Sequence, residues 1–437
     1  MKLAVIGVGN AGSRIVNNIL DVEKETGRNL CNGNTLLVNS TKPTFDVDEH
    51  VPEERRLVIG DVYWDADGSD IDGDPELAAT IAREEKNDIN RAFDLIEFHQ
   101  VDGILVVAGL GRGTGGGAGA VVIDQLNEIC DHPIYAVGVL PAEAEGDEAA
   151  LSAARTLQSF VTKADNVITF DNDAWQDDDE QRWVDEVESP DEVAPPDGEA
   201  PTGDDADRSG YGPVNTALAE RLVTLFAAGE FSAPSASESR MDPSDIMRTL
   251  DTGGLSSIGY ASVELPQGGG IRSLVRSLSN RYSWMPGGAW ASAPLTEMDD
   301  EDAGTAAAKI NNLVREAARS KLTLPCEITS ADRALVVLSG PSETLSRKGF
   351  EGGRYWLERE ADIVDVMAGD EPHDRATSLT AVVLFSNVTD VARIEEIQET
   401  AVEHQQALDA DETLDESAED PAGESADETA TEAVDSR

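Results

Sequence analysis

Two apolar runs in this sequence end directly in glycine-rich segments, and each is followed by a helix pattern. The first run, 2-KLAVIG-7, continues into 7-GVGNAG-12, and the second, 103-GILVVA-108, continues into 109-GLGRGTGGGAG-119. Glycine costs conformational entropy when a chain folds, so its repeated use at a strand end indicates a sharp turn or a close approach of the backbone to another group. The pattern predicts strand–glycine loop–helix units.

Strand and helix patterns alternate through the first 176 residues. Further strands are predicted at 35–40, 133–140 and 166–170, with helices at 13–20, 118–130 and 147–163 and from Pro75. Runs of Val, Ile and Leu without polar alternation are typical of parallel strands buried on both faces. The expected fold class is therefore α/β with a parallel sheet. Ligands of such sheets bind beyond the carboxyl ends of the strands.

Composition divides the chain further. Residues 177–208 hold 14 acidic residues and two arginines, and residues 409–437 hold 12 acidic residues and one arginine, without hydrophobic periodicity. Such segments cannot bury enough apolar surface to fold. The expected organisation is an N-terminal domain at 1–176, a disordered acidic insert at 177–208, a central helix and following loop at 209–254, a second α/β domain at 255–400 and a disordered acidic tail at 401–437.

The charge of the chain excludes several kinds of partner. With 33 basic and 86 acidic residues the formal net charge is −53, and nucleic acids and anionic membranes bind basic surfaces. Apolar residues make up 40% of the chain, which favours a folded protein of a salt-rich cytoplasm, where salt screens repulsion between surface carboxylates. The sequence shows neither a signal-peptide pattern nor an apolar run of the roughly 20 residues that a membrane span needs. A cytoplasmic protein without membrane insertion is expected.

The three cysteines, Cys31, Cys130 and Cys326, are widely spaced and form no CxxC pair. This spacing favours free thiols over a disulfide or a metal site, so no protein metal ligands are expected.

The two glycine segments lie at the ends of strands where they can hold one polyphosphate. Backbone N–H groups and the dipole at a helix amino end both attract phosphate, and Thr114 adds a hydroxyl donor. The chain has no GxxxxGK[ST] motif and is therefore not a P-loop NTPase. An NAD(P)-dependent enzyme built on Gly7, Gly9 and Gly12 is an alternative, but the second strand ends in Asn39-Ser40, where such enzymes place an acid for the ribose. Glycines that only ease helix–strand packing are a second alternative.

The run 111-GRGTGGG-117 resembles the GGGTG[TS]G loop of the tubulin/FtsZ superfamily. The opening MKLAVIGVGNAG, 145-EGDEAALSAARTLQSF-160, 170-FDNDAW-175 and 393-RIEEIQE-399 are similar, in the same order, to the archaeal CetZ branch, including its haloarchaeal members. The resemblance spans nearly everything except the acidic insert and tail. It implies a tubulin/FtsZ-like fold with a Rossmann-like GTPase domain, a central helix and a C-terminal α/β domain that completes the contact with the next subunit.

The resemblance also implies a guanine-nucleotide site. The two glycine segments would hold the α- and β-phosphates, Glu145 would lie beside the ribose, and Asn172, Tyr211 and Asn215 would contact the base. Tyr211 and Asn215 are four residues apart and so share a helix face, although Asn172 in an Asx turn and Tyr211 as a linker aromatic remain alternatives. The expected nucleotide-binding residues are Gly9, Asn10, Ala11, Gly12, Asn39, Gly111, Arg112, Gly113, Thr114, Gly115, Gly116, Gly117, Glu145, Asn172, Tyr211 and Asn215.

The implied catalytic element is 242-DPSD-245, similar to DFAD-type sequences of the superfamily. Asp242 and Asp245 would activate water on the GTP of the next subunit, while Mg²⁺ offsets the charge on the phosphates. Asp242 can also cap the helix at 243–250, with Pro243 in its first position, and the two roles are compatible. The implied activity is GTP hydrolysis to GDP coupled to head-to-tail filament assembly in cell shape control or division. The implied partners are further copies of the chain and other tubulin-like proteins.

Several residues depart from the superfamily pattern, among them Arg112 and Gly116 in the run 111-GRGTGGG-117. Asp70 and Asp72 stand before the helix at Pro75, where glycine and alanine are usual, and carboxylates repel a γ-phosphate unless a cation lies between them. Arg112 in the glycine segment is expected either to offset part of that charge or to point into solvent. Arg240 stands where FtsZ proteins have an asparagine. These departures favour nucleotide binding over efficient hydrolysis, and the alternative is a non-hydrolysing or non-polymerising paralogue that regulates other filaments.

Overall fold

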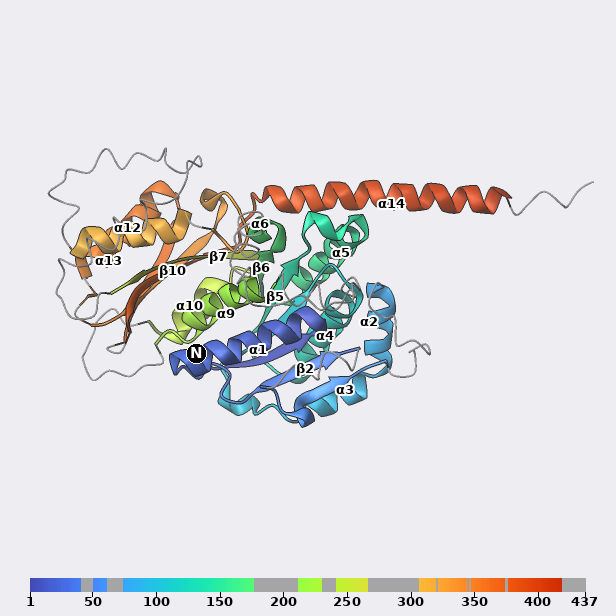
Figure 1. Ribbon diagram of the computed structural model, residues 1–437, viewed down its shortest axis with the longest axis horizontal. Coiled ribbons are helices and arrows are strands. Elements are labelled where there is room, and N and C mark those ends of the chain that lie inside the picture. Colours follow the sequence, from blue (N-terminus) through green and yellow to red (C-terminus); the bar gives the residue numbers. More distant parts are fainter. Residues whose placement is uncertain are drawn as a thin grey trace, which may run out of the picture.

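The computed structural model describes residues 1–40, 50–60, 74–176, 211–229, 241–265, 306–319, 321–342, 344–345, 347–373 and 376–418 (Figure 1). Asp70, Asp72 and Arg240 lie outside the described residues, as do the predicted insert at 177–208 and the tail from 419 onward. The expectations for these segments stay predictions.

Within the described residues, ten strands form one sheet in the order β3-β2-β1-β4-β5-β6-β7-β10-β8-β9. Strands β1 to β6 pair in parallel, β10 is antiparallel to β7 and β8, and β8 pairs in parallel with β9. The predicted α/β class with a parallel N-terminal sheet is confirmed. The strands are β1 Leu3–Val8, β2 Thr35–Asn39, β3 Arg56–Val58, β4 Gly103–Gly109, β5 Ile134–Leu140, β6 Asn166–Asp171, β7 Leu255–Glu264, β8 Arg333–Gly340, β9 Asp365–Pro372 and β10 Ser378–Ser386.

Helices cover both faces of this sheet. Alternate residues of β1 point to opposite sides: Leu3 and Val5 pack in one apolar core and Ala4 and Ile6 in the other. Helices α1, α9 and α10 lie over the first core, whereas α2, α4, α5, α12 and α13 lie over the second. Their bounds are α1 Gly9–Thr26, α2 Pro75–Glu84, α3 Lys86–Phe93, α4 Gly119–Ile129, α5 Asp147–Lys163, α6 Asn172–Gln176, α9 Gly212–Phe226, α10 Pro243–Leu250, α12 Ala306–Arg319, α13 Arg347–Glu360 and α14 Ala392–Ala418.

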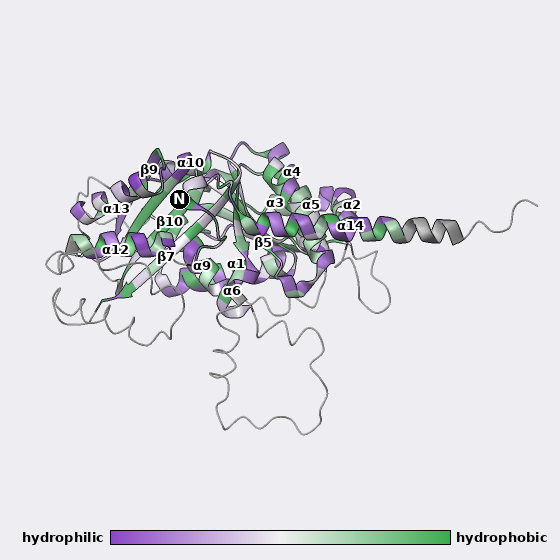
Figure 2. Cartoon of the chain, turned by 90° about the horizontal axis from the view of Figure 1, so that it is seen from above, coloured by the Kyte–Doolittle hydropathy of each residue, from purple (hydrophilic) through white to green (hydrophobic). Residues whose placement is uncertain are grey.

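The hydropathy of the chain follows this layering. Green hydrophobic segments run along the strands, and purple hydrophilic residues lie on the outer faces of the helices (Figure 2). Both apolar cores extend from the N-terminal strands to the C-terminal ones; Leu105 and Leu335 belong to one, and Ile104 and Val336 to the other. The two predicted α/β regions therefore share a continuous sheet and continuous cores.

Helix α14 differs from the sequence expectation. The acidic tail was expected from residue 401, but α14 continues to Ala418 and lies along α5 (Figure 1). Ile397 and Ala401, four residues apart and therefore on one helix face, are buried at 3% and 5% exposure. This short apolar face anchors a helix whose acidic composition resembles that of a disordered segment.

A buried ion pair joins the segment that follows α1 to the C-terminal half of the molecule. Arg28, between α1 and β2, donates from Nη1 and Nη2 to the two carboxylate oxygens of Glu371 on β9, at 3.0 and 2.6 Å. The side chains are 5% and 0% exposed. Removing one partner of such a pair leaves an uncompensated buried charge.

Replacing Arg28 with Met is expected to lower the free energy of unfolding by about 3–5 kcal/mol because Glu371 would keep its charge in an apolar environment. The double variant Arg28→Met/Glu371→Leu is expected to recover most of that loss. Arg91→Gln, which breaks an exposed pair with Asp88, is the control and is expected to cost less than about 1 kcal/mol. Denaturant titration in molar KCl measures all three. If Arg28→Met lowered the free energy of unfolding no more than Arg91→Gln does, the assignment of Arg28 and Glu371 as a buried ion pair would be contradicted.

Candidate functional site

A cavity of about 600 Å³ opens at the carboxyl ends of the central parallel strands. Its walls come from the ends of β1, β4 and β5, the amino ends of α1, α6 and α9, and the second glycine segment. This is the position at which α/β sheets bind ligands, and the volume is in the range of small-molecule sites. The predicted residues that line it are Gly9, Asn10, Ala11, Gly111, Arg112, Thr114, Gly115, Glu145, Asn172, Tyr211 and Asn215.

The two glycine segments touch each other at one end of the cavity. Gly9, with φ of +72°, begins α1, and a Cβ added to it would lie 3.0 Å from the backbone nitrogen of Gly115. A Cβ on Gly115 would lie 2.2 Å from the carbonyl oxygen of Gly109. A side chain at Gly9 would therefore meet the second segment, and one at Gly115 would meet the backbone of its own segment. The absence of side chains brings two stretches of backbone N–H groups to one place.

This end of the cavity has the chemistry of an anion site. No side chain among the described residues caps the amino end of α1, and the first turn of α1 carries no acidic residue. The first N–H groups of a helix without such a cap are available to an anion, and the helix dipole adds to the attraction. The guanidinium groups of Arg14 and Arg112 also line this cavity.

Five predicted residues do not line the cavity: Gly12, Asn39, Gly113, Gly116 and Gly117. Three of them are required by packing instead. A Cβ on Gly12 would lie 2.2 Å from the Val107 carbonyl, one on Gly116 would lie 2.4 Å from Thr156, and one on Gly117 would lie 2.0 Å from the Pro75 carbonyl. The packing alternative therefore applies to these three glycines, whereas Gly9 and Gly115 are closely packed and also line the cavity.

The second glycine segment is also more helical than predicted. Residues Thr114–Ala118 form a π-helical turn that continues into α4, so the expected loop ends at Gly113. Asn39 acts through its neighbour, because its Nδ2 donates to Oδ1 of Asn10 at 2.7 Å. Next to it, the hydroxyls of Ser40 and Thr114 are 2.6 Å apart. Asn39 and Ser40 thus orient Asn10 and Thr114, which line the cavity.

Polar side chains gather at the other end of the cavity. The Tyr211 hydroxyl donates to Oε1 of Glu145 at 3.2 Å, and the same oxygen accepts the Ala142 N–H at 3.0 Å. Tyr211 and Asn215 occupy the first turn of α9, where the Asn215 N–H donates to the Tyr211 carbonyl, and both line the cavity as their spacing predicts. Asn172 begins α6 and faces the same space. Two amides, a phenol ring and a carboxylate can together contact a base and a sugar.

Six cavity residues were not predicted from the sequence: Val8, Arg14, Gly109, Val139, Leu140 and Pro141. Arg14 lies one turn beyond Asn10 on α1, so helical spacing could have found it. Val139, Leu140 and Pro141 stand at the carboxyl end of β5, next to β4 in the sheet. Their position follows from the strand order, which the sequence does not state.

The predicted catalytic aspartates lie on α10, outside the lining of the cavity. Asp242 caps this helix: its Oδ1 accepts the Ser244 N–H at 2.8 Å, and Asp245 Oδ2 accepts the Asp242 N–H at 3.2 Å. The predicted cap is confirmed. Hydrogen bonds from Ser244 lower the pKa of Asp242 and keep it ionised. Within one chain neither carboxylate lines the cavity.

The strand β9 fixes the position of α10. The Met241 N–H donates to the Asp370 carbonyl at 3.3 Å, and a Cβ on Gly369 would lie 2.8 Å from Met241 Cα. At the other end of α10, Arg248 pairs with Asp365 at 3.3 Å. The aspartates are thus held on the C-terminal half of the molecule.

A nucleoside triphosphate with Mg²⁺ fits the groups of this cavity. The uncapped helix end and two arginines suit phosphates, and the amide and phenol groups suit a base. No group of three or more His, Cys, Asp or Glu side chains among the described residues could hold a metal ion. In nucleotide sites Mg²⁺ is held largely by phosphate oxygens and water and needs few protein ligands. None of the described helices is both long enough and apolar enough to span a membrane.

Sequence matches define the class of protein. Residues 2–179 match the GTPase domain of the tubulin/FtsZ family, and residues 204–403 match the C-terminal domain of the tubulin-like CetZ proteins. The chain is 38% identical over 409 residues to the tubulin-like protein CetZ3 of Haloferax volcanii, covering 93% of both chains. The chain belongs to the CetZ family of tubulin-like proteins, and the resemblance inferred from the sequence is confirmed.

Solved structures of relatives have the same fold. The GDP-bound monomer of CetZ1 from Haloferax volcanii matches with a TM-score of 0.70 at 33% identity, covering 93% of this chain and all of the other. The GTPγS-bound protofilament of CetZ2 from the same organism matches with a TM-score of 0.69 at 27% identity, covering 94% of this chain and all of the other.

Gly117→Ala tests whether this glycine serves packing. The added methyl would meet the Pro75 carbonyl at the start of α2, so the free energy of unfolding is expected to fall by about 2 kcal/mol or more. Gly212→Ala is the control, since nothing lies within 4 Å of its Cβ position. Thermal and denaturant unfolding measure both variants. Unchanged stability with weaker nucleotide binding would instead place Gly117 beside the phosphates.

Proposed function

We propose that this protein binds GTP in the cavity, assembles head to tail into cytoplasmic filaments and hydrolyses GTP at the contact between subunits. Its proposed role is in cell shape control or division. The observation that carries the proposal is that the two ends of the cavity differ in chemistry. One end offers the uncapped amino end of α1 and the second glycine segment with Arg112, and the other offers Glu145, Asn172, Tyr211 and Asn215.

The phosphate end acts by geometry and charge. Gly9 and Gly115 have no side chains, so backbone N–H groups of both segments can reach phosphate oxygens. Arg14 and Arg112 would neutralise part of the triphosphate charge, and Thr114 would donate its hydroxyl. Mg²⁺, when bound, supplies further charge compensation as the phosphate–oxygen bond breaks. The sequence match of residues 2–179 to the GTPase domain supports this assignment.

The base end favours guanine over a dinucleotide. Asn172 and Asn215 each offer one amide donor and one acceptor to a base edge, and Tyr211 offers a ring face. An NAD site would need a carboxylate at the end of β2 for the ribose. That position holds Asn39, whose Nδ2 hydrogen bonds to Asn10. The GDP-bound and GTPγS-bound structures of relatives support a guanine nucleotide.

Hydrolysis at a subunit contact follows from the position of α10. Asp242 and Asp245 are carboxylates on the C-terminal half that do not line the cavity of their own chain, and hydrogen bonds from Ser244 lower the pKa of Asp242. In a head-to-tail arrangement they would face the γ-phosphate of the next copy, orient a water and accept its proton. Head-to-tail contacts do not close and generate open filaments. The protofilament formed by the relative CetZ2 supports this arrangement.

The nucleotide assignment is tested by identifying what the purified protein binds. Denaturation of protein purified in molar KCl is expected to release GDP or GTP, and added GTP is expected to displace it with ATP and NAD(P) ineffective. Guanine is expected to be preferred because of the Asn172 and Asn215 amides at the base end of the cavity. Release of NAD(P), or equal displacement by ATP, would contradict the proposal.

Asp245→Asn tests the catalytic role without disturbing the helix cap, because the amide oxygen can still accept the Asp242 N–H. GTP binding is expected to stay within twofold while turnover falls by about 100-fold, the usual size of a general-base effect. Asp251→Asn, at the other end of α10, is the matched control and is expected to keep full turnover. Phosphate release and nucleotide titration give the two readouts.

Three outcomes of that experiment are distinct. Weakened GTP binding in Asp245→Asn would place α10 in the cavity of its own chain. Unchanged turnover would remove Asp245 from the reaction. An inactive wild-type protein that binds GTP and does not pellet with it would favour the non-hydrolysing, filament-regulating alternative.

A further inference from the structure

The first turn of α14 reaches into the wall of the cavity through one side chain. Arg393 donates from Nη2 to the Pro141 carbonyl at 3.0 Å, and its Nε lies 3.4 Å from Oδ1 of Asp171. The side chains of Arg393 and Asp171 are 13% and 3% exposed, so this contact is largely shielded from solvent. Pro141 lines the cavity, and Asp171 immediately precedes Asn172, which also lines it.

A chain of hydrogen bonds continues from Asp171 to the opposite wall. Asp171 Oδ1 accepts the Asp173 N–H at 3.1 Å, which fixes the turn that carries Asn172. Asp173 Oδ1 in turn accepts the Glu143 N–H at 2.9 Å, two residues before Glu145. Arg393 therefore stands at the start of a network that links both polar walls at the base end.

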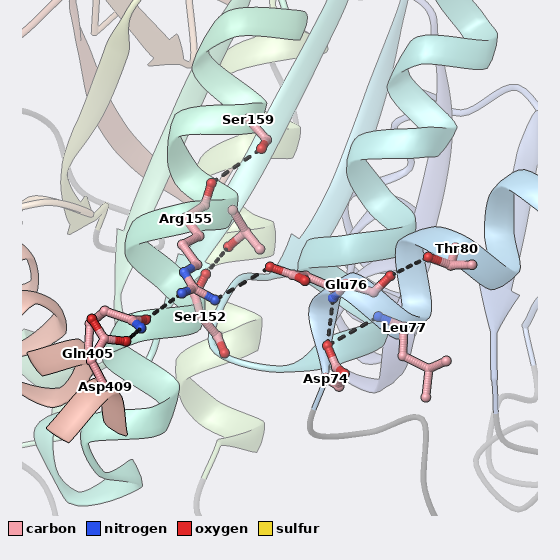
Figure 3. Close-up of polar contacts among 10 residues, drawn as sticks. Asp74, Glu76, Leu77, Thr80, Ser152, Arg155, Ser159, Gln405 and Asp409 are labelled. Carbon is pink, nitrogen blue, oxygen red and sulfur yellow. Dashed lines mark hydrogen bonds and ion pairs between the residues drawn. The ribbon is translucent and has the colours of Figure 1, made fainter. Parts of the chain in front are cut away.

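The other polar contacts of α14 with the body are exposed. Arg155 of α5 donates to Gln405 at 2.5 Å and pairs with Glu76 in the first turn of α2 at 3.6 Å (Figure 3). Glu76 is 82% exposed and Arg155 48%. In molar salt, exposed charges more than about 3 Å apart are screened, whereas buried pairs are screened much less. The Arg393 contact is the one expected to persist.

We propose that Arg393 is a positioning residue for the nucleotide site: by binding Pro141 and Asp171 it holds Asn172 and the turn before Glu145 in the shape that receives a guanine nucleotide. This inference rests on the proposed function. It gives the first turn of α14 an influence on nucleotide affinity through Arg393 alone, although α14 contributes no residue to the cavity lining.

Protonation of Asp171 gives the proposal a characteristic readout. The pKa of Asp171 is raised to about 6 because burial, together with the smaller effect of the Asp173 charge, outweighs Arg393 and the N–H groups of Asp173 and Ala174, which lower it. The network needs the ionised carboxylate, so nucleotide affinity should fall as the pH drops through about 6. Without Arg393 the pKa rises, and the fall should begin at a higher pH.

The test is titration with N-methylanthraniloyl-GDP in molar KCl between pH 5.5 and 8. Arg393→Gln is expected to weaken binding by about tenfold, the size expected for losing a hydrogen bond to a charged group, and to move the pH midpoint upward. Arg393→Lys keeps the charge but not the fork of donors, so an intermediate affinity with a wild-type midpoint is expected. Arg155→Gln and Arg354→Gln, which remove exposed pairs, are controls and should stay within twofold.

The outcomes of this titration separate failure of the inference about Arg393 from failure of the proposed function. Equal affinity and pH midpoint in Arg393→Gln and wild type would overturn this inference and leave the proposed function standing. Weakening by Arg155→Gln as large as that by Arg393→Gln would show that general docking of α14 is responsible and would also overturn it. Failure of the wild type to bind the probe would overturn the proposed function itself. Unfolding curves of the nucleotide-free variants establish that each is folded; if Arg393→Gln is not, Arg393→Lys carries the test, and wild-type affinity in it would overturn the inference.

Discussion

The close approach of two backbone segments at the ends of β1 and β4 determines the rest of the site. Gly12 lets α1 lie against the Val107 carbonyl, and Gly9 and Gly115 let the two glycine segments meet. A single methyl at Gly12 or Gly115 would fall about 2.2 Å from a carbonyl oxygen, so the geometry excludes every other residue type there. Because this contact fixes where α1 begins, it also fixes the direction of the helix dipole toward the cavity.

The continuous sheet explains why the cavity and the predicted catalytic aspartates lie apart within one chain. Strand β9 anchors α10 through Met241 and joins the nucleotide half through the buried Arg28–Glu371 pair. The same packing that makes the body rigid therefore holds Asp242 and Asp245 away from their own cavity. A rigid body with a nucleotide on one half and carboxylates on the other is suited to head-to-tail contacts, in which each copy completes the next.

Much of this could be predicted from the sequence because its strands are uninterrupted apolar runs that end in glycine. The order of strands in the sheet could not, since it depends on long-range pairing, and Val139, Leu140 and Pro141 were missed for that reason. Helix α13 was missed because Gly349 and Gly353, required by close packing against α12, weaken its helix pattern. Strand β9 was missed because it is an edge strand with Gly369 inside and Pro372 at its end. In the second glycine segment, composition could not separate glycines that face the cavity from glycines that only permit packing.

The central claim is that GTP bound in the cavity of one chain is hydrolysed with carboxylates of another. Specific GTPase activity measured against protein concentration in molar KCl tests it most directly, because a shared site requires neighbours. The account predicts low activity per molecule when the protein is dilute and a rise above a threshold concentration, together with the formation of sedimentable polymer. Activity per molecule that stays constant down to the lowest concentration would contradict it.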